Sequence, residues 1–85
     1  MNKDQLTRAI SLATKEFHRR YFTMPDRILI NRAHDKVLFS GLQKRAINGV
    51  AIHTDDMTPA GEMLLQLDSM MYGKHSVTMA FSSFA

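Results

Sequence analysis

The first part of the chain has the hydrophobic spacing of an amphipathic helix. Apolar side chains recur every three or four residues and would form one stripe along such a helix. The positions of this stripe are Leu6, Ile10, Ala13, Phe17 and Tyr21. Asn2 or Asp4 can accept hydrogen bonds from the first free backbone N–H groups, and the arginines near the other end suit the helix dipole. We therefore predict a helix from about Asp4 to Tyr21.

A short strand and a second helix are predicted next. Pro25 ends the first helix, because its ring drives the preceding residue into an extended conformation. The apolar, β-branched run at residues 27–31 is typical of a buried strand. Asn31 is suited to cap a helix from about Arg32 to Ser40, and Gly41 is suited to end that helix in the left-handed conformation.

The hydrophobic period changes to two after Asn48-Gly49, which is a strong turn signal. Apolar side chains alternate with other residues over residues 50–53, 63–67 and 76–82, and this pattern is typical of β-strands. The connectors between these segments are short and rich in turn residues, which favours antiparallel neighbours. The predicted order of elements is therefore α-β-α-β-β-β.

This order predicts an α+β fold in which the two helices pack on one face of a mainly antiparallel, four-stranded sheet. The core candidates are Leu6, Ile10, Phe17, Val37, Ile52, Leu65, Val77, Met79 and Phe81. The opposite sheet face would carry Ala51, His53, Leu64, Gln66, Ser76, Thr78, Ala80 and Ser82. A solvated sheet face normally carries charged residues, and this one has almost none. We expect it to pack against a second copy of the chain, with Leu64 and Ala80 in the contact.

Met70, Met71 and Tyr72 form an apolar group in a connector that should otherwise be polar. Flexible thioethers suit irregular contact surfaces. Two interpretations are open: the connector contacts a neighbouring subunit or partner, or it folds back over the edge of the sheet.

The chain length favours one small domain that gains stability from association. Its 85 residues, of which 45% are hydrophobic and 22% charged, allow a single domain over residues 1–85. A domain of this size buries a modest share of its surface when it folds alone. The absence of cysteine excludes a disulfide scaffold and a thiol nucleophile. The first ten residues carry charges and lack the apolar run of a signal peptide or membrane span, so we expect a cytoplasmic location and no membrane partner.

The charge is distributed unevenly along the chain. Residues 1–45 hold ten Lys or Arg against four Asp or Glu, whereas residues 46–85 hold one against four. The basic candidates on the first helix are Arg8, Lys15, Arg19 and Arg20. If they converge with the basic residues that follow, they can neutralise several phosphates of a nucleic acid. The alternatives are a solvated helix exterior and head-to-tail association of the two oppositely charged halves.

His53, Asp55 and Asp56 are the group in which imidazole and carboxylates lie close in sequence. Such groups bind zinc or manganese, but two aspartates followed by proline and glycine are also typical of an ordinary turn. We interpret this segment as a turn and predict neither a metal nor another cofactor. The sequence contains no Gly-x-Ser-x-Gly motif and no phosphate-binding glycine loop, so we expect no enzyme.

The chain resembles small α/β proteins encoded by phages and prophages in its opening amphipathic helix and in two later segments. These segments are residues 25–31 and residues 49–56, the latter followed by Pro59 and Gly61. The resemblance lies in the pattern of turns and strands over about the middle half of the chain, so it implies an accessory protein of a mobile element and assigns no functional residue. The leading hypothesis is a small, non-enzymatic interaction or adaptor protein that forms a homodimer and binds a protein partner. The alternative is a nucleic-acid-binding protein that uses the basic face of the first helix.

Overall fold

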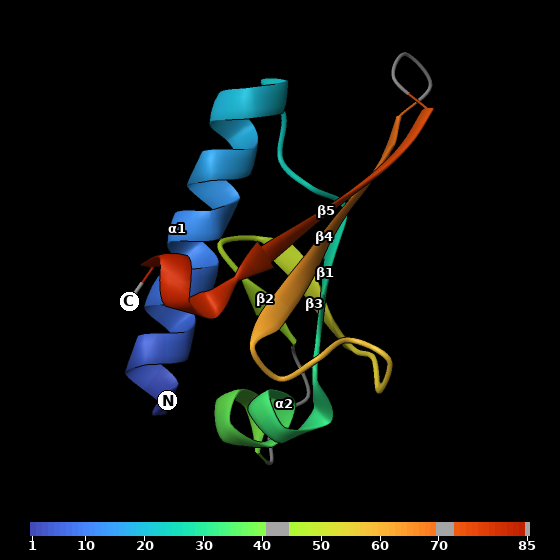
Figure 1. Cartoon of the computed structure of the whole chain (residues 1–85). Coiled ribbons are helices and arrows are strands. Elements are labelled where there is room, and N and C mark those ends of the chain that lie inside the picture. The colour runs from blue at the N-terminus through green and yellow to red at the C-terminus, as the bar shows by residue number, and fades with distance from the viewer. Residues whose placement is uncertain (41–44, 70–72, 85) are drawn as a thin grey trace.

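The structure is a computed structural model that describes residues 1–40, 45–69 and 73–84 (Figure 1). Its elements in chain order are α1 (Lys3–Tyr21), β1 (Arg27–Ile30), α2 (Arg32–Phe39), β2 (Ala46–Ile47), β3 (Val50–Thr54), β4 (Glu62–Ser69), β5 (Gly73–Ala80) and the 3₁₀ turn η1 (Phe81–Phe84). The predicted α+β class and both predicted helices are confirmed. The predicted end of α2 at Gly41 lies outside the described residues.

The sheet has five strands in the order β2-β3-β1-β4-β5, so the prediction of four mainly antiparallel strands is wrong in detail. The additional strand, β2, pairs with β3 across the turn at Asn48 and Gly49, both of which have positive φ angles, of 53° and 78°. The central strand β1 is parallel to β3 and antiparallel to β4. The parallel pair arises because α2 forms a crossover between β1 and β3, and parallel neighbours need such a connection.

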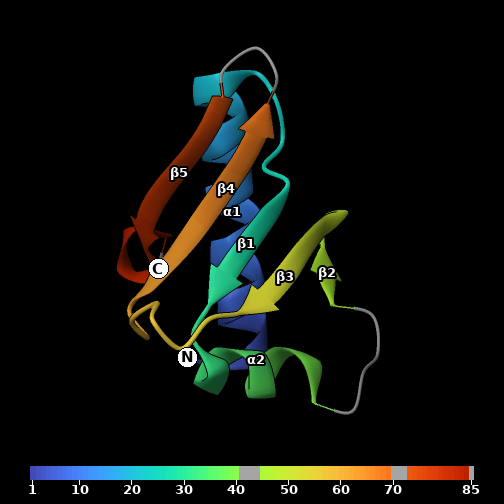
Figure 2. The ribbon, with the colours of Figure 1, turned by 90° about the vertical axis from the view of Figure 1, so that its right-hand side faces the viewer.

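The two helices do not share one face of the sheet as predicted. Figure 2 shows α1 behind the sheet, whereas α2 lies beyond the end of β1. Asn31 follows β1 directly and caps α2 by accepting a hydrogen bond from the Ala33 N–H at 3.0 Å, so the helix begins at the end of the sheet. Leu38 and Phe39 are the buried residues of α2, and the core candidate Val37 is 43% exposed. The prediction for Val37 is therefore wrong.

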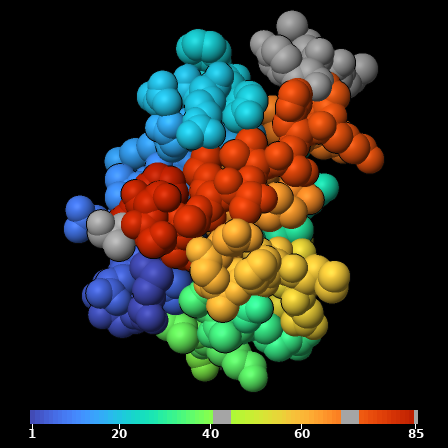
Figure 3. Space-filling model, in the orientation of Figure 1, coloured from blue at the N-terminus to red at the C-terminus, as the bar shows by residue number. Residues whose placement is uncertain are grey.

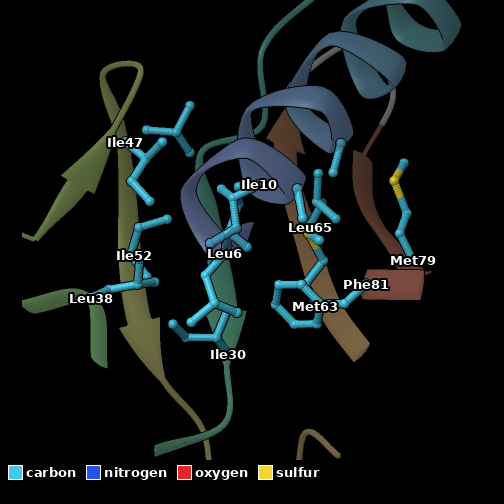
Figure 4. Close-up of a cluster of buried hydrophobic side chains, with 14 of the residues drawn as sticks. Leu6, Ile10, Ile30, Leu38, Ile47, Ile52, Met63, Leu65, Met79 and Phe81 are labelled. Carbon is cyan, nitrogen blue, oxygen red and sulfur yellow. The ribbon is translucent and has the colours of Figure 1, made fainter. Parts of the chain in front are cut away.

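The core lies between α1 and the sheet, and Figure 4 shows Leu6 and Ile10 of α1 close to the side chains of the strands. Most of the predicted core is confirmed: Leu6, Ile10, Phe17, Ile52, Leu65, Met79 and Phe81 are buried, and the half-buried Val77 packs against them. The N-terminus of α1 is fixed by a capping box. The Gln5 N–H donates to Asn2 Oδ1 at 2.8 Å, and the Asn2 N–H donates to Gln5 Oε1 at 2.9 Å.

Neither α1 nor α2, the α-helices of the part of the chain that the structure describes, combines the length and the apolar character that crossing a bilayer requires.

Candidate functional site

The outer face of the sheet, which points away from α1, has an apolar centre. Leu29 on β1 lies opposite His53 on β3 and opposite Leu64 on β4, and Leu64 lies opposite Thr78 on β5. Paired residues in a sheet point to the same side, so these four side chains form one row across four strands. Leu29 and Leu64 are half-buried neighbours in the middle of that row. Figure 2 views the sheet from this side, and none of the described helices covers it.

Charged residues surround this centre, and they correct the expectation of an almost uncharged face. Arg27 lies on β1 and donates from Nε to Gln66 Oε1 at 2.6 Å, while Glu62 lies opposite Ala80. Asp68 and Lys74 form a directly opposed pair near the far end of the β4–β5 hairpin. The face is therefore apolar in its middle and carries both signs of charge near its ends.

The predicted contact residues have different positions relative to this face. Leu64 lies at its centre, and Ala80 lies near its end at the last residue of β5. Ser82 belongs to η1 and not to a strand, so its assignment to the sheet face is wrong. The other candidates, Met70, Met71 and Tyr72, lie outside the described residues.

The basic face of α1 is partly neutralised by Glu16. The Glu16 carboxylate accepts hydrogen bonds from Arg19 at 2.9 and 2.6 Å and from Arg20 at 3.0 Å. These bonds to Arg19 and Arg20 lower the pKa of Glu16 from 4.5 to about 2. Within the described residues, Arg8 and Lys15 take part in no ion pair. Two of the four predicted nucleic-acid-binding residues are therefore free for a ligand.

Two basic residues beyond α1, Arg32 and Arg45, are paired with carboxylates. Arg32 donates to the two carboxylate oxygens of Asp56 at 3.1 and 3.0 Å, and this bidentate pair lowers the pKa of Asp56. Arg45 donates from Nη2 to Thr54 Oγ1 at 2.7 Å and forms an ion pair with Asp35. Both arginines are thus bound to carboxylates of their own domain.

A groove that sequence reasoning missed lies between α1 and η1. Two adjacent hollows, with volumes of about 420 and 490 Å³, share Arg8 and Phe84 in their walls. The space-filling view shows η1, in red, directly against α1, in blue (Figure 3). Arg8 and Phe84 are more than 70 positions apart in the sequence, so no local pattern of residues indicates this groove.

The candidate metal ligands are not arranged as one site. His53 is exposed on the outer face of the sheet. Asp55 accepts hydrogen bonds from the Met57 N–H at 3.1 Å and from the Thr58 hydroxyl at 2.8 Å, and Asp56 is bound to Arg32. No group of three potential ligands that could hold a metal ion occurs within the described ranges. Asp55 instead has the local role that a turn gives to an aspartate, and Asp56 forms a long-range ion pair.

A polar network between α2 and β3 was also missed from the sequence. The Thr54 hydroxyl donates to Asp35 Oδ2 at 2.8 Å and accepts from Arg45, and Asp35 is paired with Arg45. Asp35 and Thr54 are 19 positions apart, and Arg45 lies about midway between them, so the spacing of the three residues gives no signal. This network joins α2 to the sheet.

No family model, no curated protein and no solved structure matches the chain. Function is therefore inferred from the outer sheet face and from the surfaces of α1 alone.

Proposed function

We propose that this protein is a small, non-enzymatic interaction module that forms a homodimer through the outer face of its sheet. The observation that carries the proposal is the half-buried pair Leu29 and Leu64 at the centre of a sheet face that none of the described helices covers. Packing this face against a second sheet would remove the remaining apolar area of both side chains from water, which is the main driving force of association.

The charges of this face support a two-fold arrangement. Arg27 lies two residues from Leu29 along β1, on one side of the row that contains Leu29 and Leu64. Glu62 lies two residues from Leu64 along the neighbouring strand β4, on the other side of this row. Consider a two-fold axis that lies between the two facing sheets and runs across the strands at this row. It places the Arg27 side of one copy over the Glu62 side of the other. It therefore places Arg27 of each copy across from Glu62 of the other copy, offset by about one strand spacing, roughly 5 Å, and separated by the roughly 10 Å between two packed sheets, a gap that the two inward-pointing side chains can span.

The size of the molecule is compatible with such a dimer. A standard interface buries about 800 Å² on each partner, which is about 15% of the accessible surface of 5433 Å² of this chain. One broad face of a domain that measures 36 × 26 × 23 Å can supply this area.

Sedimentation equilibrium at about 100 µM, well above a micromolar dissociation constant, tests the proposal with two matched variants. The first, Leu64→Lys, places a charge at the centre of the outer face. The second, Val37→Lys, makes a similar change at an exposed apolar position of α2, away from the sheet. We expect a dimer for the unmodified chain and for Val37→Lys, and a folded monomer, judged by circular dichroism, for Leu64→Lys.

Two results would contradict the dimer. One is a monomer for the unmodified chain at this concentration. The other is a dimer that persists in folded Leu64→Lys, because a buried lysine without a partner is too costly for such an interface to survive.

Nucleic-acid binding, the alternative from the sequence, has weaker support. Arg19 and Arg20 share the carboxylate of Glu16, and Arg32 and Arg45 are bound to other carboxylates. Of the four candidates on α1, two therefore keep an unpaired charge among the described residues, and two cations on one helix face are too few to neutralise the row of phosphates on which the affinity of such proteins depends. We also propose a cytoplasmic location and an origin in a phage or another mobile element, and the second proposal rests on the resemblance alone.

A further inference from the structure

We propose that the groove between α1 and η1 binds a segment of a partner protein in which an apolar side chain lies between two carboxylates. This site is separate from the outer sheet face, and it would give the dimer a surface for a second kind of protein. The proposal rests on the groove, on its apolar floor and on two cations that have no ion-pair partner among the described residues.

The floor of the groove is apolar. Phe84 is half-buried and packs against the hydrophobic core. Leu12, on the outward side of α1, is also half-buried and lines the same hollow as Phe84. Met1 is 50% exposed at the other hollow. These side chains leave apolar area in contact with water, which an apolar side chain of a ligand would cover.

Two cations without an ion-pair partner among the described residues flank this floor. Arg8 and Lys15 are seven positions apart, two turns of α1, which corresponds to roughly 10.5 Å along the helix axis. Leu12 lies between them on the same side of α1. Both cations are exposed and, in the part of the chain that the structure describes, neither has an ion-pair partner. The nearby charge of Arg19, by contrast, is already paired with Glu16.

This arrangement matches an acidic and apolar peptide. Side chains of an extended peptide alternate between two sides, so carboxylates four residues apart point the same way and are separated by roughly 13 Å. One can then face the long side chain of Arg8 while the other faces that of Lys15. An apolar side chain between them then faces Leu12. On the η1 side, the exposed Ser82 and Ser83 line the two hollows and offer hydroxyl groups for the peptide backbone.

The same chemistry argues against nucleic acid as the occupant. A nucleic acid needs a continuous row of cations along its backbone, and the cations of this groove are interrupted by an apolar floor. A peptide can place its own apolar side chain at that interruption, and the two charged contacts then fix its register.

The test uses a fluorescein-labelled synthetic peptide with two glutamates four residues apart and a leucine midway between them, measured by fluorescence anisotropy with the full chain. Control peptides replace both glutamates by glutamine or the leucine by serine. The protein variants are Arg8→Glu and Lys15→Glu. The matched control is Lys36→Glu, which makes the same charge change at an exposed residue of α2.

We expect saturable binding of the acidic peptide, with affinity about fivefold lower for each groove variant and unchanged for Lys36→Glu. Both control peptides should bind more weakly than the acidic peptide. The proposal is overturned if no peptide binds, if the three lysine and arginine variants lose affinity equally, or if the leucine-to-serine peptide binds as well as the parent.

A parallel titration with labelled single-stranded and double-stranded DNA separates the two occupants. DNA binding that is tighter than peptide binding and is lost in Arg8→Glu would assign this face to nucleic acid and overturn the proposal. The dimer is tested independently, because Arg8→Glu leaves the outer sheet face unchanged and sedimentation of this variant should still give a dimer.

Discussion

The connection between the end of β1 and α2 allows one prediction to be worked in detail, because Asn31 has two separable hydrogen bonds there. Its Oδ1 accepts from the Ala33 N–H at 3.0 Å and caps α2, and its Nδ2 donates to the Thr58 carbonyl at 3.1 Å. Losing a cap costs about 1 kcal/mol, and losing the second bond costs about 1 kcal/mol more. We expect Asn31→Ala to lower the free energy of unfolding by about 2 kcal/mol.

A second variant divides this cost between the two bonds. Asn31→Ser keeps a side-chain oxygen for the cap but has no amide to reach Thr58, so it should lose about 1 kcal/mol. In a domain of this size each kcal/mol lowers Tm by roughly 4 to 8 °C. Urea titrations and thermal unfolding of the three proteins at one fixed concentration measure these differences.

The reasoning about Asn31 is refuted by either of two results. If Asn31→Ala and Asn31→Ser lose the same stability, the oxygen at this position does not cap α2. If Asn31→Ala changes stability by less than about 0.5 kcal/mol, neither bond contributes as the geometry implies.

Two further predictions concern Glu16 and Gly49. The pKa of Glu16 is about 2 in the folded chain against an ordinary 4.5, so its stabilisation is present above pH 4.5 and is lost as the pH falls toward 2. The difference in urea midpoint between the unmodified chain and Glu16→Gln should therefore be largest near neutral pH and disappear near pH 2, and a constant difference would contradict this. Gly49 has φ of +78° and open space where a Cβ atom would lie, so Gly49→Ala should cost about 1 kcal/mol through backbone strain alone. Gly61→Ala, which has the same open space without a positive φ, should cost nothing in the same urea titration.

The hydrophobic periods were sufficient to predict both helices and four of the five strands, but not β2, η1 or the order of the strands in the sheet. The stripe from Leu6 to Phe17 and the alternation around Leu65 report which side of an element is buried, and both were read correctly. The pairing of β1 was not predictable, because Arg27 pairs with Ala51 and Gln66, which are far along the chain. A two-residue strand such as β2 has no period to detect. The helix α2 is two turns long and has apolar residues on all sides, so its sequence does not indicate which side is exposed.

Hydrophobic spacing predicted only some of the residues on the outer sheet face and on the basic face of α1. Leu64 was placed on the outer face because it alternates with buried neighbours, whereas Leu29 was missed because it lies within an uninterrupted apolar run. That run was interpreted as burial on both sides of the strand, and Leu29 in fact lies at the centre of the uncovered face. Glu16 precedes Arg19 by three residues and Arg20 by four, which is the spacing of neighbours on a helix. The sequence therefore indicates that the net positive charge of the basic face is smaller than the number of its cations suggests.

Because β1 is the central strand, the sheet cannot form around it until the later strands have been synthesised. Both neighbours of β1 come from residues 50 and beyond, so α1 has no sheet to cover until β3 and β4 have been made. Until then the apolar side of α1 is open to other nascent chains. The same early segment, residues 1–45, carries ten basic residues against four acidic ones. The repulsion between these positive charges opposes contact between nascent chains while the apolar side of α1 is not yet covered by the sheet.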